Sequence, residues 1–371
     1  MNIAFFANPG SVHDCKWINI LSKKHKCYVI CNVSNNQSLW QLDKKIEVFP
    51  ILPDTYSAIS NSSTKSLLLE FVKEKNIDIC HSMYLYTNAL WVALIDFDFH
   101  IITTRGSDIL IDLEKTLKTG RNIREKIAHF FLRRACLSAI KKAYSITSTS
   151  NAQYKVISKY IRQKERLHII PTGINWSRVE AFLEEQNTNP LKNDYIFSAR
   201  SMAPIYRIEL VVDTFYAFMQ KDRGDMKLVL IDDKGQTAYS KKIRAQIKKL
   251  GIEDRIYWVN SLTLAQMTAF YKHAQACLML PKSDGTPNTA LEAMYCKTPL
   301  IMPNLPYDDN LFDKQFVYRA KSDDPVEIAQ LISKAIEDPQ KEQKLEKARA
   351  NVLQKASLMD SIAKIESLYL G

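Results

Sequence analysis

The sequence predicts an α/β protein with two Rossmann-like domains, each built on a doubly wound parallel sheet. Three observations support this fold class. Strand-like and helix-like segments alternate along the chain, the alternation restarts near residue 195, and 371 residues exceed one typical hydrophobic core. Strands separated by helices of 10–15 residues are typical of βαβ units, whose strands pair in parallel.

The first half begins with a short apolar run, residues 2–8, which we interpret as a buried strand. An amphipathic helix is expected next, at residues 12–26. The pattern then continues with strands at 27–33, 77–83 and 100–107 and a helix at 66–76. The last of these strands ends in a polar loop.

The second half repeats this alternation. We expect strands at 194–200, 226–233, 256–261 and 276–283, and helices at 208–221, 238–251 and 264–273. Between the halves, Pro171, Thr172 and Gly173 interrupt the pattern, as turn residues do. The sequence therefore predicts one domain over residues 1–172 and a second over 173–371, with the last helix free to pack back on the first domain.

The composition is that of a globular protein, with 46% hydrophobic and 25% charged residues. The N-terminus lacks the basic stretch of a secretory signal, and no segment approaches the roughly 18 apolar residues of a membrane span. The seven cysteines show no CxxC spacing. We therefore expect buried, reduced thiols in a cytoplasmic protein.

The net charge of +11 is unevenly distributed. Residues 1–172 hold 24 basic and 14 acidic residues, a net charge of +10, whereas residues 173–371 hold 27 and 26, a net charge of +1. A basic domain indicates an anionic partner, either nucleic acid, an acidic membrane surface or a phosphorylated substrate. The alternative is a solvated basic surface that binds nothing.

The segment PKSDGTPNTALEAMYCKTPLI carries two carboxylates, Asp284 and Glu292, with seven residues between them. We expect a loop at the carboxyl end of a strand, followed by a helix over residues 288–296. Pro287 suits the first helical position and Thr286 can cap the helix. Asp284 then lies on the loop side of the helix N-terminus, and Glu292 about one turn inside the helix.

Such a helix N-terminus is a potential anion site, because its first N–H groups, near Asn288, Thr289 and Ala290, lack helical partners. Carboxylates on either side accept hydrogen bonds from vicinal hydroxyls. A nucleotide sugar has the matching order of sugar, diphosphate and ribose. The alternative is structural, with Asp284 as a turn residue and Glu292 on the helix surface.

This segment resembles the donor motif of glycosyltransferase family 4, retaining enzymes of the two-domain GT-B architecture. In that family a Glu, seven residues and a second Glu form the motif, and the resemblance implies that the first acid contacts sugar hydroxyls and the second the ribose. This chain departs from the pattern with Asp284 in the first position. Weaker similarities lie in IIPTGIN, in IDICHS and in TTRGSDIL, where Arg105 stands in place of a frequent His.

The resemblance extends to SARSMAPIYRIELVVDTF, which is similar to the family pattern GR…KG…ll.AF. The family's Arg and Lys neutralise the donor diphosphate, and Arg200 matches the Arg. The Lys has no clean counterpart, and Arg207 is nearest, one residue out of step. Fixed cations and helix N–H groups would stabilise the leaving diphosphate without a metal. The resemblance also implies that His81 borders the donor sugar and that Arg105 meets a phosphate or the acceptor.

A Gly after the first strand lets a backbone approach a diphosphate closely, which suggests a role for Gly10, and His13 on the next helix is an acceptor contact. Three residues are assigned to catalysis: Arg200, Asp284 and Arg105. The expected donor contacts are Gly10, His81, Arg207, Gly285, Thr286, Pro287, Asn288, Thr289 and Glu292.

The sequence thus predicts a retaining glycosyltransferase that moves a sugar from a nucleoside diphosphate sugar to a glycan or lipid-linked glycan in surface polysaccharide biosynthesis. A sugar-nucleotide epimerase and a non-catalytic glycan-binding or scaffold subunit are the alternatives.

We expect no cofactor and no metal, since Asp96–Asp98 matches a DxD metal signature only over three residues. No motif supports a nucleic-acid partner. Residues 121–146 are interpreted as a basic, partly amphipathic helix that could face an anionic membrane or else pack within its domain.

Overall fold

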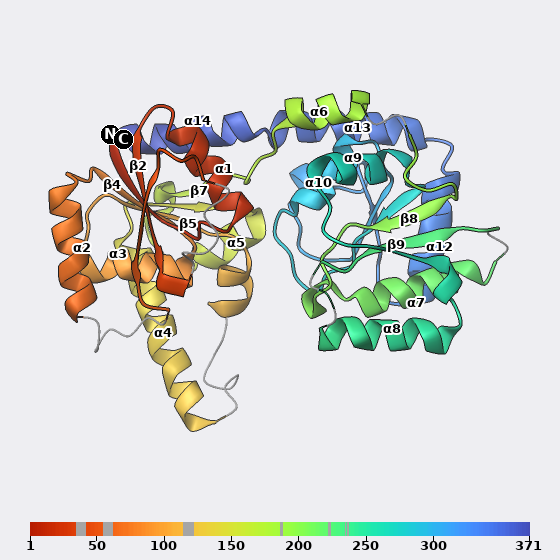
Figure 1. Cartoon of the computed structure of the whole chain (residues 1–371), viewed down its shortest axis with the longest axis horizontal. Helices are drawn as coiled ribbons and strands as arrows, with labels where there is room; N and C mark the ends of the chain where they lie inside the picture. The colour runs from red at the N-terminus through yellow and green to blue at the C-terminus, as the bar shows by residue number, and fades with distance from the viewer. Residues whose placement is uncertain are drawn as a thin grey trace. The chain divides into compact units, whose positions relative to one another are not determined.

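The computed structural model describes residues 1–34, 42–54, 62–113, 122–185, 188–221, 224–233, 235 and 237–371. These residues form two compact units (Figure 1). Unit 1 comprises Met1–Thr172 and Asp360–Gly371, and unit 2 comprises Gly173–Met359. The chain leaves unit 1 after Thr172 and returns to it at Asp360.

Unit 1 is built on a parallel sheet that has seven strands among the described residues, in the order β3-β2-β1-β4-β5-β6-β7. Its strands are β1 (Asn2–Phe6), β2 (Lys26–Asn32), β3 (Glu47–Leu52), β4 (Ile79–Met83), β5 (His100–Thr103), β6 (Ser145–Ser148) and β7 (Leu167–Ile169). Its longer helices are α1 (Val12–Leu21), α2 (Ser62–Glu74), α3 (Leu90–Ile95), α4 (Ile123–Lys142), α5 (Asn151–Ile157) and α14 (Leu358–Leu370). The strand order reverses between β1 and β4, which is where ligands bind in doubly wound sheets.

Unit 2 repeats this plan with six parallel strands among its described residues, in the order β10-β9-β8-β11-β12-β13. The strands are β8 (Tyr195–Ser198), β9 (Lys227–Ile231), β10 (Ile256–Val259), β11 (Ala276–Leu278), β12 (Leu300–Met302) and β13 (Tyr318–Arg319). The helices are α6 (Trp176–Glu185), α7 (Ile208–Met219), α8 (Ala238–Leu250), α9 (Leu264–His273), α10 (Asn288–Tyr295), α11 (Asp309–Phe312), α12 (Pro325–Glu337) and α13 (Lys341–Lys355). Here the order reverses between β8 and β11.

Helices cover both faces of the unit 2 sheet. One hydrophobic cluster joins the sheet to α6, α9, α10 and α13, and a second joins it to α7, α8 and α12. The central strand β8 is buried along its whole length, which explains its continuous apolar sequence. The two sheets confirm the predicted α/β fold class.

Several predicted elements have different boundaries in the structure. The strand expected at 276–283 ends at Leu278, and the helix expected at 12–26 ends at Leu21. The basic helix expected over 121–146 runs from Ile123 to Lys142, and Ser145 already begins β6. Strands β3, β6, β7, β12 and β13 were not predicted, and none of them shows a clear alternation of apolar and polar residues.

Both ends of unit 2 meet at Gly173. Ile174 forms a parallel bridge with Ser357, and the Gly173 backbone takes a φ of +74°. A Cβ at Gly173 would lie 2.6 Å from the Leu358 Cα, so this position requires glycine.

Among the described helices, none is both long and apolar enough to span a bilayer. All seven cysteines are buried and unpaired, as expected.

Candidate functional site

The expected donor site lies at the carboxyl ends of β8 and β11 in unit 2. Arg200 lies two residues after the end of β8, and Asp284 lies in the loop between β11 and α10. The two strands are neighbours in the sheet, so residues 84 positions apart in the sequence meet at one edge. The backbone N–H of Lys282 donates to the Ile205 carbonyl at 2.8 Å, which fixes this loop against the segment after β8.

Arg200 is held on several sides. Its Nη2 donates to Asp284 Oδ2 at 2.7 Å and its Nη1 donates to Thr289 Oγ1 at 2.8 Å. The guanidinium carbon lies 4.0 Å from the centre of the Tyr206 ring. Arg200 is 9% exposed, and its Nε finds no hydrogen-bond partner among the described residues. Two of the five N–H donors of Arg200 are therefore used by Asp284 and Thr289, and the Nε–H is buried.

Helix α10 begins at Asn288, and Pro287 occupies its N-cap position. The expectation that Thr286 caps the helix and Pro287 forms its first turn is therefore wrong by one residue. Proline offers no side-chain acceptor, so the N-cap residue itself supplies no capping oxygen. The positive end of the helix dipole lies next to the Arg200 guanidinium, which donates to Thr289 in the first turn. Gly285 donates its N–H to Asp284 Oδ1 at 2.9 Å.

Glu292 lies in the second turn of α10 and is half-buried. The hydroxyl of Tyr271 on α9 donates to Glu292 Oε2 at 3.4 Å. Burial and the nearby Glu292 carboxylate raise the pKa of Tyr271, which keeps this phenol protonated as a donor. Asp284 and Glu292 therefore lie on either side of the α10 N-terminus, as the spacing in the sequence predicts.

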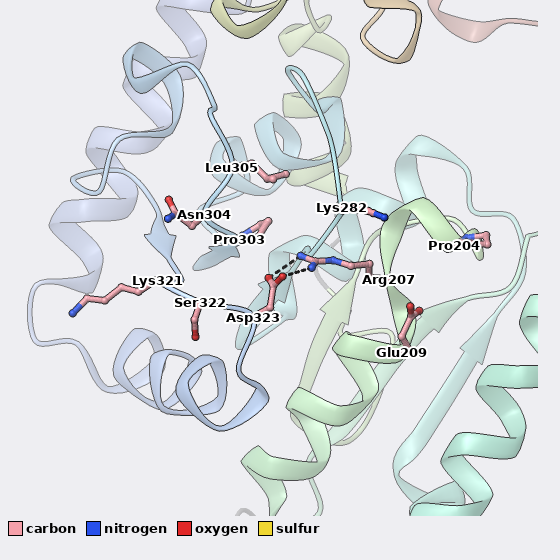
Figure 2. A pocket seen from close by; sticks show the side chains of 10 residues that line it. All are labelled: Pro204, Arg207, Glu209, Lys282, Pro303, Asn304, Leu305, Lys321, Ser322 and Asp323. Carbon is pink, nitrogen blue, oxygen red and sulfur yellow. Dashed lines mark hydrogen bonds and ion pairs between the residues drawn. The ribbon is translucent and has the colours of Figure 1, made fainter. Parts of the chain in front are cut away.

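Arg207 does not join this group. Its guanidinium pairs with both carboxylate oxygens of Asp323, at 2.5 and 3.0 Å (Figure 2). It also donates to the carbonyls of Leu280 and Pro281. It lines a cavity of about 580 Å³ formed by Pro204, Arg207, Glu209, Lys282, Pro303, Asn304, Leu305, Lys321, Ser322 and Asp323. The expected contact of Arg207 with the donor diphosphate finds no support in this arrangement.

The backbone of Arg207 explains the mismatch of one residue. Its φ is +48°, in the left-handed region that glycine adopts most readily. Arg207 also lies directly before α7, so the resemblance to the family pattern suggests that it stands at the Gly of the Lys-Gly pair and Tyr206 at the Lys. The sequence analysis named Arg207 instead of Tyr206 because the family residue at this place is a cation. In the family pattern the Gly comes directly before the hydrophobic helix, as Arg207 does here. Counting back from the start of that helix would have identified Tyr206.

In unit 1, three of the expected residues gather near the carboxyl ends of β1 and β5. Gly10 precedes α1, His13 is exposed in the first turn of α1, and Arg105 follows β5. Arg105 Nη2 pairs with Asp14 Oδ1 at 2.7 Å and reaches the His13 carbonyl at 3.4 Å. Burial raises the pKa of Asp14, and the Arg105 guanidinium opposes this shift. Sequence analysis did not predict that Asp14 balances the charge of Arg105.

His81 lies in the core of unit 1 and has no exposed surface. Its Nδ1 is 2.6 Å from the Tyr369 hydroxyl of α14 and its Nε2 is 2.7 Å from Thr103 Oγ1. Burial lowers the pKa of His81 to about 3, so the ring is neutral near pH 7. Both ring nitrogens are engaged within unit 1, and the expected contact with the donor sugar finds no support here.

Two family models match the chain, Glycosyl transferase 4-like over residues 2–149 and Glycosyl transferases group 1 over residues 179–352. Among curated proteins, the alpha-monoglucosyldiacylglycerol synthase of Streptococcus pneumoniae is 24% identical over 264 residues, which is 68% of this chain. The match spans 57% of that relative's length, which is less than two thirds.

Solved structures agree with the family models. A glycosyltransferase from Rickettsia africae has a TM-score of 0.73 at 15% identity, over 99% of this chain and 97% of that one. Anabaena HepE in complex with UDP-glucose has a TM-score of 0.75 at 16% identity, over 99% of both chains. At these identities the likeness shows the fold. With one model on each half of the chain, the protein belongs to the group 1 glycosyltransferases, family 4, and has their GT-B fold.

Proposed function

We propose that this chain transfers a sugar, with retention of anomeric configuration, from a nucleoside diphosphate sugar to a glycan or lipid-linked glycan. The observation that supports this most is the arrangement of Arg200 between Asp284 and Thr289, at the N-terminus of α10. A guanidinium beside a helix N-terminus favours a diphosphate as its ligand, because both present positive charge and N–H donors.

The chemistry follows from the charges in the reaction. Breaking the bond between the anomeric carbon and the phosphate leaves negative charge on the diphosphate. Arg200 and the first turn of α10 stabilise that charge because they are oriented before the donor binds. A phosphate oxygen of the leaving group takes the proton of the acceptor hydroxyl, so the proposal needs no enzyme nucleophile. No residue of this set requires a divalent ion.

Glu292 is proposed to accept hydrogen bonds from the ribose of the donor. Its carboxylate lies one turn inside α10, and the protonated Tyr271 hydroxyl reaches one of its oxygens. A carboxylate can accept several hydrogen bonds, so Glu292 can accept from the ribose while Tyr271 donates to it. Asp284 is proposed for the sugar side, although one of its oxygens already accepts from Arg200.

The relatives suggest where to begin the search for substrates. HepE was solved with UDP-glucose, which makes UDP-glucose the first donor to test. The pneumococcal relative is named for a glucosylated diacylglycerol, and WaaG is described as a glycosyltransferase involved in lipopolysaccharide biosynthesis. Both descriptions favour a lipid-linked acceptor for this chain, in the synthesis of a surface polysaccharide.

We further propose that unit 1 binds the inner face of the cytoplasmic membrane peripherally, through α4. Four large apolar side chains of this helix are exposed: Ile123 by 74%, Ile127 by 50%, Phe130 by 46% and Phe131 by 63%. Their helical spacing puts them on one face, and Arg134 and Lys141 continue that face toward the C-terminus. Figure 1 shows the N-terminal half of α4 extending beyond the other helices of unit 1. An exposed apolar face with cations is typical of helices that lie in an anionic interface.

A panel of nucleotide sugars tests the proposed reaction. Ligands that bind the folded protein raise its melting temperature, so the donor should give the largest shift. Transfer is then measured with radiolabelled sugar from that donor to a membrane extract. Labelled glycolipid or glycan supports the proposal, a new sugar-nucleotide epimer supports the epimerase, and the absence of binding to every nucleotide sugar supports the non-catalytic subunit.

A further inference from the structure

We propose that Tyr206 is a positioning residue for Arg200, whose guanidinium it holds in place through its ring. The inference rests on the proposed function, because it assigns Arg200 to the donor diphosphate. Tyr206 ends a short 3-10 helix, Pro204–Tyr206, just before α7. Its ring lies 4.0 Å from the guanidinium carbon of Arg200.

The contacts of Arg200 define the orientation of its guanidinium. Asp284 and Thr289 each accept one N–H group, and the Tyr206 ring covers the guanidinium plane at stacking distance. The side chain is only 10% exposed, so little water competes for these contacts. A cation over an aromatic face in such a desolvated place is held strongly, because the electron-rich face attracts positive charge.

The family pattern GR…KG has a lysine where this chain has a tyrosine. The left-handed backbone of Arg207 puts Tyr206 at the lysine position of that pattern. A lysine there would add a second positive charge, whereas the tyrosine adds none. Arg207 does not replace that charge, because Asp323 holds it in a bidentate ion pair on the side of the cavity in Figure 2. Arg200, beside the N-terminus of α10, is the cation that we assign to the diphosphate, so its orientation matters for donor binding.

The inference predicts what a change at Tyr206 does. Without the ring, Arg200 keeps two hydrogen bonds but can swing about them. A group that must orient during the reaction stabilises the transition state less than one that is already oriented. Loss of Tyr206 should thus lower kcat as well as donor affinity, and it should do so only through Arg200.

Binding of UDP, measured by calorimetry, tests this with five variants, one of which is Arg200→Ala. Tyr206→Ala should weaken UDP binding about tenfold, as expected for a desolvated cation–aromatic contact. Tyr206→Phe keeps the ring and should recover most of that loss. In the Arg200→Ala background, Tyr206→Ala should have no further effect, because two residues that act as one unit are not additive. Tyr216→Ala removes a half-buried tyrosine of α7 as a packing control, and should lower the melting temperature without changing UDP affinity.

Two results would overturn the inference. One is UDP affinity in Tyr206→Ala equal to that of the native protein. The other is a second tenfold loss when Tyr206→Ala is added to Arg200→Ala, which would mean that Tyr206 contacts the ligand directly.

A readout without ligand separates this inference from the proposed function. The Nε–Hε signal of Arg200, assigned by its loss in Arg200→Lys, reports the mobility of the guanidinium in NMR relaxation. Tyr206→Ala should increase that mobility and Tyr206→Phe should not. If no nucleoside diphosphate binds the native protein, the proposed function fails, and unchanged Arg200 mobility in Tyr206→Ala overturns the positioning role independently.

Discussion

The Nδ1 atom of His81 lies 2.6 Å from the hydroxyl of Tyr369, and this hydrogen bond joins β4 to the last helix, α14. Lys24 and His25 strengthen the same attachment, since both pair with Glu366 on α14. The C-terminal helix is thus part of the unit 1 core. An ionisable ring at the centre of this attachment makes the stability of unit 1 sensitive to acid.

We expect the free energy of unfolding to fall as the pH drops below about 6.5. Burial lowers the pKa of His81 and of His100 from 6.5 to about 3. Between pH 6.5 and pH 3 these histidines are protonated in the unfolded chain but neutral in the folded chain. Their contribution to the free energy of unfolding is therefore fully present above pH 6.5 and is lost progressively toward pH 3. Each ring contributes a slope of about 1.4 kcal/mol per pH unit. Urea unfolding at several pH values between 7 and 4 measures the slope.

Two variants separate titration from packing. His81→Asn removes one titrating ring. The dependence of the free energy of unfolding on pH should therefore lose the contribution of one histidine, about 1.4 kcal/mol per pH unit. Tyr369→Phe leaves the ring in place but removes its partner, which should cost roughly 1–3 kcal/mol at every pH without changing the slope. An unchanged slope in His81→Asn would mean that His81 does not cause the acid sensitivity.

The Glu292→Gln variant tests the ribose contact. It replaces a charged acceptor with a neutral amide of the same shape. Hydrogen bonds to charged groups contribute roughly 1.5–3 kcal/mol, so donor affinity should fall roughly 10- to 100-fold in calorimetry. Glu253→Gln, at an exposed position of unit 2, is the matched control and should bind the donor normally. Unchanged affinity in Glu292→Gln would remove this carboxylate from the site.

Activity should survive chelation, because Arg200 and the α10 N-terminus are proposed to hold the diphosphate. Arg200→Ala should lower kcat/KM by about two orders of magnitude or more, in line with the loss of one preoriented charge. Initial rates with and without EDTA show whether activity survives chelation. Loss of turnover in EDTA and recovery with Mn²⁺ would contradict it and would return attention to Asp96 and Asp98, although Asp96 pairs with Lys142 at 2.6 Å.

The sequence revealed those parts of the site that depend on local pattern. The spacing of Asp284 and Glu292, the loop at the end of β11 and the position of Arg200 after β8 are all readable within short segments. The α/β class follows in the same way, because a strand and its helix are neighbours in the chain. Family membership, inferred from these segments, is confirmed by models that match both halves.

The features that the sequence did not reveal depend on contacts between segments that are distant in the chain. Asp14 and Arg105 are 91 positions apart, and Arg207 and Asp323 are 116 apart. No local pattern tells which acid balances which arginine. His81 shows the same limit, since a polar residue near the end of a strand resembles an edge residue. In the structure His81 lies in the middle of β4, and its buried side chain contacts Tyr369 of α14 in the core of unit 1.

The last prediction concerns α4 and the membrane. The structure changes which residues a test should use. Arg133 donates to the Leu113 carbonyl and to the Tyr160 hydroxyl, both at 2.9 Å, and Lys142 pairs with Asp96. Neutralising Arg133 would therefore disturb folding as well as charge. Arg124, Arg134 and Lys141 are exposed and serve the test better.

Vesicle sedimentation should show binding that requires anionic lipid and falls steeply from low to high salt. Each lysine or arginine near such a surface contributes about 1 kcal/mol, within roughly one Debye length. Changing Arg124, Arg134 and Lys141 to Gln should weaken binding at low salt. Changing Ile123, Ile127 and Phe131 to Ser should weaken the part of binding that persists at high salt, because apolar contact is not screened.

A control for exposed apolar residues is available on the same unit. Leu67 and Leu69 of α2 are exposed by 51% and 46%, and changing both to Ser should leave vesicle binding intact. Equal loss from the α2 and α4 changes would point to general hydrophobic adhesion. Equal recovery of the native protein on neutral and anionic vesicles would leave the +10 charge of residues 1–172 without a membrane role and would favour a soluble acceptor. Binding that depends on the α4 face alone would place unit 1 where a lipid-linked acceptor is found.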